Sequence, residues 1–131
     1  MNKRIITFGT FDVFHIGHIN ILERARKQGD YLVVGVSSDQ LNFTKKQRYP
    51  IYPQDQRVKI LESLRFVDEV FIEESLEFKA KYIAQYRADA LVMGDDWAGK
   101  FNDMQEHCEV VYLPRTPSIS TSEIIEVVKA L

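Results

Sequence analysis

The sequence predicts an α/β fold, namely a doubly wound five-stranded parallel sheet with helices on both faces. Short apolar runs rich in β-branched residues alternate along the chain with stretches whose apolar residues recur at helical spacing, which is typical of parallel sheets covered by helices. No internal repeat divides the 131 residues, so one Rossmann-like domain over residues 1–131 is expected. The expected strands cover residues 5–8, 31–36, 70–72, 90–93 and 110–113.

Four amphipathic stretches predict helices, over residues 16–28, 55–64, 76–86 and 121–131. In the first stretch, Ile19, Leu22 and Ala25 form one apolar stripe, and Gly29 supplies a helix stop. The last stretch follows Ser120, a favoured N-cap residue with a glutamate three residues later, as in a capping box.

Composition and charge exclude several classes of protein. The chain is 45% hydrophobic, enough to bury a core without disulfides, and its single cysteine, Cys108, has no partner cysteine in the sequence. A formal charge of −2 has the wrong sign for a protein whose main partner is nucleic acid. No apolar run approaches the ~20 residues of a membrane span, and the N-terminus shows no signal region. We therefore expect a cytoplasmic protein that binds neither nucleic acid nor membrane.

The most specific pattern follows the first expected strand, where the sequence reads GTFDVFHIGH. Ligands of open parallel sheets bind beyond the carboxyl ends of the strands. His15 and His18 lie at the start of a helix, whose free N–H groups attract anions, and two imidazoles there could donate hydrogen bonds to phosphate. Gly9 would let the backbone approach a ligand, and Gly17 would permit close packing. A lone histidine is more often a capping or core residue, but the HxGH pair favours a phosphate site.

A zinc site is the competing interpretation of these histidines. Asp95, Asp96, His107 and Cys108 could complete a ligand set. However, the two loop histidines do not have the i, i+4 spacing of a helical zinc motif, and no CxxC pair is present. In addition, His107 and Cys108 are adjacent in the sequence. These features disfavour a structural zinc ion.

Cationic side chains that suit a phosphate ligand follow the second expected strand. The longest irregular stretch is expected over residues 37–53 and contains Lys45, Lys46 and Arg48. A loop of that length in a compact domain is usually functional or mobile, so we expect it to reach phosphates. Arg57 lies off the apolar stripe of the following helix. The alternative is that these cations simply face solvent, as most lysines and arginines do.

The loops after the last two expected strands add further candidates. Gly94 and Asp95 follow the fourth strand. Asp95 could bind a ligand there, or it could simply form the turn. After the fifth strand, Arg115 could neutralise phosphate, while Ser120 and Thr121 open the last helix with hydroxyls and free amides. Ser120 could equally be an ordinary N-cap.

Together these motifs resemble a known family. The segments GTFD and HIGH, with RT at residues 115–116 and ISTS at residues 119–122, are similar to the cytidylyltransferase-type nucleotidyltransferases. The HIGH segment by itself marks only the superfamily. Four further segments extend the resemblance over almost the whole chain and look most like the glycerol-3-phosphate cytidylyltransferases: ERARKQGDYLVVGVSSD, LRFVDEV, VMGDDWAGKF and CEVVYLPRT.

The resemblance implies an enzyme that transfers a cytidylyl group from CTP to glycerol 3-phosphate, giving CDP-glycerol and pyrophosphate with the help of Mg²⁺. In the family the acceptor phosphate attacks directly. That agrees with the residues present, which supply donors and cations but no nucleophile beside an obvious base. The resemblance also implies a homodimer with LRFVDEV at the interface, although Phe66 and Val67 could equally belong to the core.

The resemblance also implies roles for individual residues. The expected catalytic residues are His15, His18, Lys46 and Arg115. The expected acceptor-binding residues are Arg57 and Arg65, and Asp12 is expected near a metal held with the nucleotide phosphates. The expected nucleotide-binding residues are Gly9, Thr10, Phe11, Asp12, Gly17, Asp39, Lys45, Gly94, Asp95, Thr116, Ile119, Ser120 and Thr121.

Two departures from the family pattern leave alternatives open. Pro117 and Ser118 stand where the family commonly has an acidic residue and a glycine, and residues 74–78 lack a tryptophan that glycerol-phosphate enzymes often carry. The acceptor is therefore less defined than the reaction type. The alternatives are the same chemistry with ATP, or with another acceptor such as ethanolamine phosphate or a sugar phosphate, and a non-catalytic nucleotide-binding module.

Overall fold

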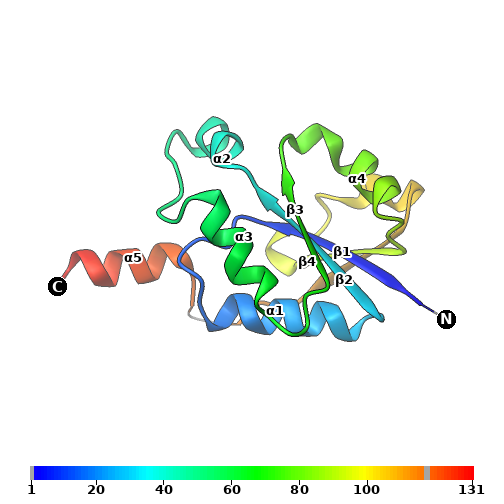
Figure 1. The fold of residues 1–131 in the computed structure, drawn as a ribbon, viewed down its shortest axis with the longest axis horizontal. Coiled ribbons are helices and arrows are strands. Elements are labelled where there is room, and N and C mark those ends of the chain that lie inside the picture. The colour runs from blue at the N-terminus through cyan, green and yellow to red at the C-terminus, as the bar shows by residue number, and fades with distance from the viewer. Residues whose placement is uncertain (1, 117–118) are drawn as a thin grey trace.

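Five parallel strands form the sheet at the centre of the computed structural model, which describes residues 2–116 and 119–131 (Figure 1). The predicted fold class is thereby confirmed, and each expected strand is found within one residue at each end. The departure noted at Pro117 and Ser118 lies outside the described residues. The strands are β1 (Arg4–Gly9), β2 (Tyr31–Ser37), β3 (Glu69–Glu73), β4 (Ala90–Gly94) and β5 (Glu109–Leu113).

The order of strands across the sheet decides where a ligand can bind. The order is β3-β2-β1-β4-β5, so the chain moves outward in one direction from β1 and then returns to the other side of β1 with β4. Loops leaving β1 and β4 therefore diverge at the carboxyl edge. A crevice opens at such a switch point, and it is where open α/β sheets bind ligands.

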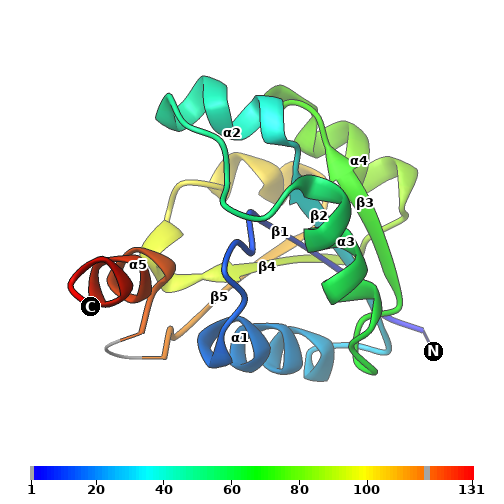
Figure 2. The ribbon, with the colours of Figure 1, turned by 60° about the vertical axis from the view of Figure 1, so that its left-hand side comes forward.

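Helices and short 3₁₀ turns connect the strands (Figures 1 and 2). The expected helix over residues 76–86 is divided into a 3₁₀ turn and a helix, and Ser75 caps the turn by accepting a hydrogen bond from the backbone N–H of Glu77. The helices are α1 (Ile16–Lys27), α2 (Asp39–Lys46), α3 (Gln54–Glu62), α4 (Lys79–Gln85) and α5 (Thr121–Lys129), and the 3₁₀ turns are Leu76–Phe78, Asp95–Trp97 and Asn102–Glu106.

Apolar side chains cover both faces of the sheet, as predicted. On one face Ile5 and Val34 pack with Leu22 of α1 and Leu61 of α3. On the other face, strand residues such as Ile6 pack with α4 and the segments around it. Successive strand residues point to opposite faces, so a run of consecutive apolar residues fills both cores.

The expectation of one irregular stretch over residues 37–53 is wrong, because α2 occupies its first half. Ser38 caps this helix, and its hydroxyl accepts a hydrogen bond of 3.0 Å from the backbone N–H of Leu41. Lys45 and Lys46 therefore lie in the last turn of α2 instead of a loop. The helix ends at Gln47, which adopts a left-handed conformation, and only residues 47–53 are irregular.

The last helix differs from the other four in its packing. Ser120 caps α5 as expected, through a 3.2 Å hydrogen bond from the backbone N–H of Glu123. All residues of α5 are described and none is buried, and the helix extends away from the sheet in Figure 1. Over residues 2–116 and 119–131, the helices are too short or too polar to cross a bilayer.

Candidate active site

A pocket of about 250 Å³ opens at the switch point of the sheet. Its walls come from the loops after β1, β4 and β5, which are the loops that the sequence singled out. The predicted site residues that line it are Gly9, Thr10, Phe11, His15, Gly17, His18, Gly94, Arg115, Thr116, Ile119, Ser120 and Thr121.

A second pocket of about 350 Å³ adjoins the first, because both are lined by Thr10, Phe11, His18 and Thr121. Its outer wall carries the cations Lys46 and Arg48. Lys46 reaches this wall from the last turn of α2. The two pockets therefore border one another, and the second has a cationic side.

The two histidines cap α1 reciprocally. Nδ1 of His15 accepts a hydrogen bond of 3.0 Å from the backbone N–H of Gly17, and Nδ1 of His18 accepts one of 3.2 Å from the backbone N–H of His15. A neutral imidazole that accepts at Nδ1 carries its proton on Nε2. Capping therefore fixes the tautomer, and both rings retain an Nε2–H donor for a ligand.

Both imidazoles are held in the neutral form. The pKa of His18 is lowered to about 3, chiefly by burial and next by repulsion from the proton that His15 would carry, while Asp12 opposes the shift. Burial also lowers the pKa of His15. Each ring therefore acts as a neutral hydrogen-bond donor at neutral pH.

The glycines of the first loop make room for aromatic rings. A Cβ on Gly17 would lie 2.9 Å from Cε1 of His15 and 3.2 Å from Ile119. A Cβ on Gly9 would lie 2.8 Å from the ring of Phe11. The expected close packing at Gly17 is thus present. At Gly9, the space that we expected a ligand to approach is filled by the Phe11 ring.

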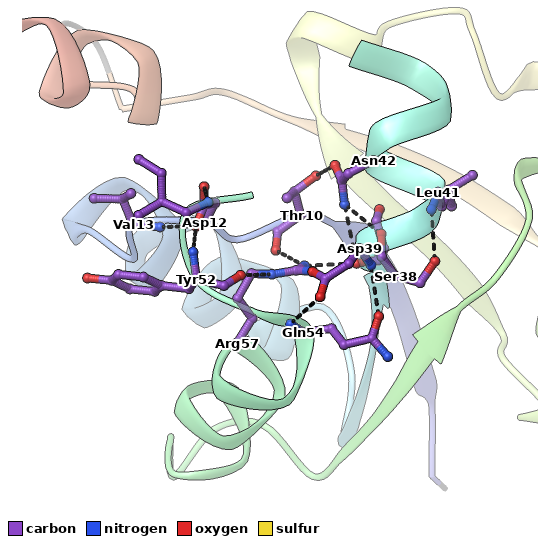
Figure 3. A network of polar contacts seen from close by, with 12 residues as sticks. Thr10, Asp12, Val13, Ser38, Asp39, Leu41, Asn42, Tyr52, Gln54 and Arg57 are labelled. Atoms are coloured by element: carbon purple, nitrogen blue, oxygen red, sulfur yellow. Dashed lines mark hydrogen bonds and ion pairs between the residues drawn. The ribbon is translucent and has the colours of Figure 1, made fainter. Parts of the chain in front are cut away.

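Asp12 anchors backbone on its side of the site (Figure 3). Its Oδ1 accepts hydrogen bonds from the backbone N–H groups of Val13 and Tyr52, at 3.0 and 2.8 Å, and its Oδ2 accepts one of 2.7 Å from Ile51. These contacts occupy both carboxylate oxygens. Among residues 2–116 and 119–131, no cluster of three His, Cys, Asp or Glu side chains could hold a metal ion. The described residues thus form no preorganised cation cage.

Arg57 and Asp39 lie beneath the same loop (Figure 3). The Arg57 side chain is fully buried, with 0% exposure. Its Nη2 pairs with Oδ1 of Asp39 at 2.7 Å, and Oδ2 of Asp39 accepts a hydrogen bond from the backbone N–H of Gln54. Asp39 therefore contacts protein groups here, and its expected role in nucleotide binding stays a prediction.

The loop after β4 presents Asp96 to the pocket, whereas the family resemblance favoured Asp95. Asp95 begins the 3₁₀ turn, which turns the next two side chains, Asp96 and Trp97, toward the pocket. The Asp96 carboxylate pairs with Arg115 at 3.5 Å across the mouth. The sequence DDW does not show which of its two carboxylates faces the pocket, because the direction of each side chain depends on the 3₁₀ turn.

As far as the described ranges show, five expected site residues lie outside the linings of both pockets: Asp39, Lys45, Arg57, Arg65 and Asp95. Lys45 lies near the buried pair of Glu73 and Lys79; loss of solvent lowers its pKa, while Glu73 raises it. Arg65 is exposed in the connection from α3 to β3, at the opposite end of the sheet from the site. In the same segment Val67 is buried and packs in the core.

Comparisons with known proteins agree with this geometry. A family model described as cytidylyltransferase-like matches residues 6–127. The chain is 50% identical over 129 residues to a glycerol-3-phosphate cytidylyltransferase of Bacillus subtilis strain 168, covering 98% of this chain and 99% of the relative. It is 48% identical over 122 residues to the enzyme of the same name from Bacillus spizizenii strain W23, covering 93% and 94%.

Solved structures support the fold. The crystal structure of a lipopolysaccharide core biosynthesis protein from Thermoplasma volcanium superposes with a TM-score of 0.74 at 24% identity, covering 88% of this chain and 99% of the other. At that identity the match establishes the architecture alone. The family model and the relatives that match nearly end to end confirm the resemblance predicted from the sequence, and the chain belongs to the cytidylyltransferase-like family.

Proposed function

We propose that this protein transfers a cytidylyl group from CTP to glycerol 3-phosphate, producing CDP-glycerol and pyrophosphate. Two relatives that match nearly end to end, at 50% and 48% identity, carry the name of that activity. The observation that carries the proposal is the pair of stacked, neutral imidazoles of His15 and His18, whose Nδ1 atoms are used in capping and which both line the first pocket, His18 lining the second as well.

In this mechanism the acceptor phosphate oxygen forms a bond to the α-phosphorus, and the bond from that phosphorus to the bridging oxygen of the β-phosphate breaks. The electron pair leaves with pyrophosphate. His15 and His18 donate hydrogen bonds to the α-phosphate as charge develops on it. Such preorganised donors are effective because they need no reorganisation in the transition state.

The β- and γ-phosphates belong on the cationic side of the second pocket. Lys46 and Arg48 lie on one wall. The N-terminus of α5 lies at the opposite side, where Thr121 lines both pockets and Ser120 lines the first. Arg115 contributes a further cation at the first pocket. A helix N-terminus and nearby cations suit a polyphosphate that carries several negative charges.

Divalent cations are generally used by this family, and we propose that Mg²⁺ is held chiefly by the nucleotide phosphates. The contacts of Asp12 support this, because three backbone N–H groups already use three of the about four acceptor positions of its carboxylate. Mg²⁺ usually keeps several water ligands and binds with substrate phosphates, so it needs few protein ligands. No step of the mechanism above depends on a protein-bound metal.

We also propose that the protein is a homodimer in which Arg65 acts on the site of the other copy. Arg65 is exposed and lies far along the fold from the pockets of its own chain. An arginine suits a phosphate monoester, because its planar fork donates two parallel hydrogen bonds. A second copy could bring this group to the acceptor.

A substrate panel tests the proposed reaction. The protein is incubated with Mg²⁺, one of CTP, ATP, GTP or UTP, and one of glycerol 3-phosphate, ethanolamine phosphate or a sugar phosphate. Pyrophosphate release is measured and the product is identified by mass. We expect CDP-glycerol from CTP and glycerol 3-phosphate. Strong activity with ATP alone would refute cytidylyl transfer, whereas activity with CTP and another acceptor would correct only the acceptor.

A further inference from the structure

A closed circuit of hydrogen bonds joins the loop of residues 9–18, which carries both histidines, to the connection of residues 47–53 (Figure 3). Both backbone polar groups of Tyr52 take part in the circuit. Its backbone N–H donates to Asp12 at 2.8 Å, and its carbonyl accepts from Nε of Arg57 at 2.9 Å. Nη1 of Arg57 then donates to the carbonyl of Thr10 at 2.9 Å, two residues before Asp12. The connection cannot move without moving this part of the histidine loop.

Arg57 holds parts of the chain that are distant in sequence. Besides Tyr52 and Thr10, it binds the carbonyl of Ser37 at the end of β2, at 2.8 Å, and the Asp39 carboxylate at the start of α2. Four of the five N–H groups of a guanidinium are thereby used within the protein. With 0% of the side chain exposed, the guanidinium has no open face for a substrate phosphate.

The circuit surrounds strained backbone. Phe11 and Val13, on either side of Asp12, have φ angles of +55° and +47°. Such angles are costly for residues other than glycine and persist only where surrounding contacts impose them. Here the Asp12 carboxylate binds the backbone N–H of Val13, and the hydroxyl of Thr121 donates to the Asp12 carbonyl at 2.7 Å. These contacts fix a conformation that leads directly into the HxGH segment.

We propose that Asp12 and Arg57 are positioning residues that fix the histidine loop against the connection bearing Arg48, rather than ligands of the metal and of the acceptor phosphate. The inference rests on the proposed function. It explains what holds the histidines, which face the α-phosphate, at a fixed position relative to Arg48, which faces the β- and γ-phosphates. The buried charge of Arg57 is balanced by Asp39, whose partner Gln54 begins α3. The network thus connects the first residues of α2, α3 and α5 with the loop after β1.

Asp12→Asn distinguishes positioning from metal binding. Asparagine keeps the size of the side chain but turns an N–H group toward a backbone N–H. We expect kcat to fall at least about tenfold, because misplaced catalytic groups are costly, while half-saturating Mg²⁺ changes less than about threefold. A rise in half-saturating Mg²⁺ of about tenfold or more would identify a metal ligand and overturn the proposal. Asp55→Asn, on the exposed first turn of α3, is the matched control.

Arg57→Lys distinguishes positioning from acceptor binding. Lysine keeps the charge but cannot reach three carbonyls and a carboxylate in one plane. We expect kcat to fall at least about tenfold with the KM for glycerol 3-phosphate within about threefold of the original. A raised acceptor KM with kcat preserved would overturn the proposal. If Arg57→Lys does not fold, Asp39→Asn replaces it, again with a lowered kcat and a nearly unchanged KM for glycerol 3-phosphate. Arg87→Lys, at an exposed position, is the control.

Amide hydrogen exchange supplies a readout that does not need turnover. In folded Asp12→Asn, the peptide spanning residues 48–53 is expected to exchange at least about tenfold faster than in the unchanged protein, because asparagine keeps only one oxygen and the backbone N–H of Ile51 or of Tyr52 loses its acceptor. Unchanged exchange would overturn the network. Absence of CDP-glycerol synthesis by the unchanged protein would instead refute the proposed function, and the exchange measurement would still decide whether the network couples the two segments.

Discussion

The imidazole rings of His15 and His18 stack with their centroids 3.8 Å apart, and the backbone N–H of His15 donates to Nδ1 of His18. The motif therefore performs two tasks with the two nitrogens of each ring. Nδ1 satisfies backbone N–H groups that a helix start leaves without partners, and Nε2 is left to donate to a ligand. Capping and catalysis are consequently not alternatives for these residues.

Replacement of His18 by alanine should abolish most activity without unfolding the protein. Loss of one preorganised donor to developing charge typically costs ~10²–10³ in kcat, and we expect at least that loss here. The measurement is pyrophosphate release at saturating CTP and glycerol 3-phosphate, with a thermal melt to verify folding. His107→Ala, at an exposed position, is the matched control and should retain full turnover. Near-normal turnover by His18→Ala would contradict the proposed mechanism.

The depressed pKa of His18 predicts a specific dependence of stability on pH. Because its pKa falls from 6.5 to about 3 on folding, the unfolded chain binds a proton more readily than the native protein does. The stabilisation is complete above pH 6.5 and is lost as the pH falls toward the folded value.

Urea unfolding at several pH values measures this effect. Between pH 6 and pH 5 we expect the unchanged protein to lose about 1 kcal/mol more unfolding free energy than His18→Gln, which cannot titrate at this position. Carboxylates contribute equally to both proteins and cancel in the difference. Parallel pH profiles for the two proteins would show that His18 titrates normally in the fold.

Gly17→Ala should damage catalysis through the position of a ring. The new Cβ would lie 2.9 Å from Cε1 of His15 and 3.2 Å from Ile119, so the His15 ring must turn away from its place over the helix start. We expect the unfolding free energy to fall by about 1–3 kcal/mol, and kcat to fall at least about tenfold. Ser63→Thr adds a methyl group at an exposed position and is the control. Unchanged kcat would mean that the His15 ring tolerates displacement.

The strands and most helices could be predicted because their signals are local. Consecutive apolar residues mark a strand buried on both faces, and the stripe of Leu22 and Ala25 marks α1. By contrast, α2 carries only Leu41 as a buried apolar residue, and its other buried residue is Asn42. A periodicity of apolar residues cannot reveal such a helix, although Ser38 followed by Asp39 was an available start signal.

The site was predictable by residue type and loop, but not by the direction of each side chain. Arg57 lies off the apolar stripe, which on an exposed helix would place it in solvent, yet partners distant in sequence bury it completely. Asp95 and Asp96 differ only in their position within a 3₁₀ turn. Both outcomes depend on tertiary contacts that a single sequence does not contain.

The exposure of Arg65 predicts that activity can be restored by mixing two defective variants. If Arg65 serves the site of the partner, a heterodimer of His18→Ala and Arg65→Ala contains one intact site, formed by the histidines of the second chain and the arginine of the first. Random exchange of subunits in a symmetric dimer should then recover about a quarter of the original activity. Each variant alone, incubated identically, is the control. Size-exclusion chromatography at several concentrations checks that dimers form. A persistent monomer, or no recovery on mixing, would assign Arg65 to some other role, because no second chain would then carry the missing group to the acceptor.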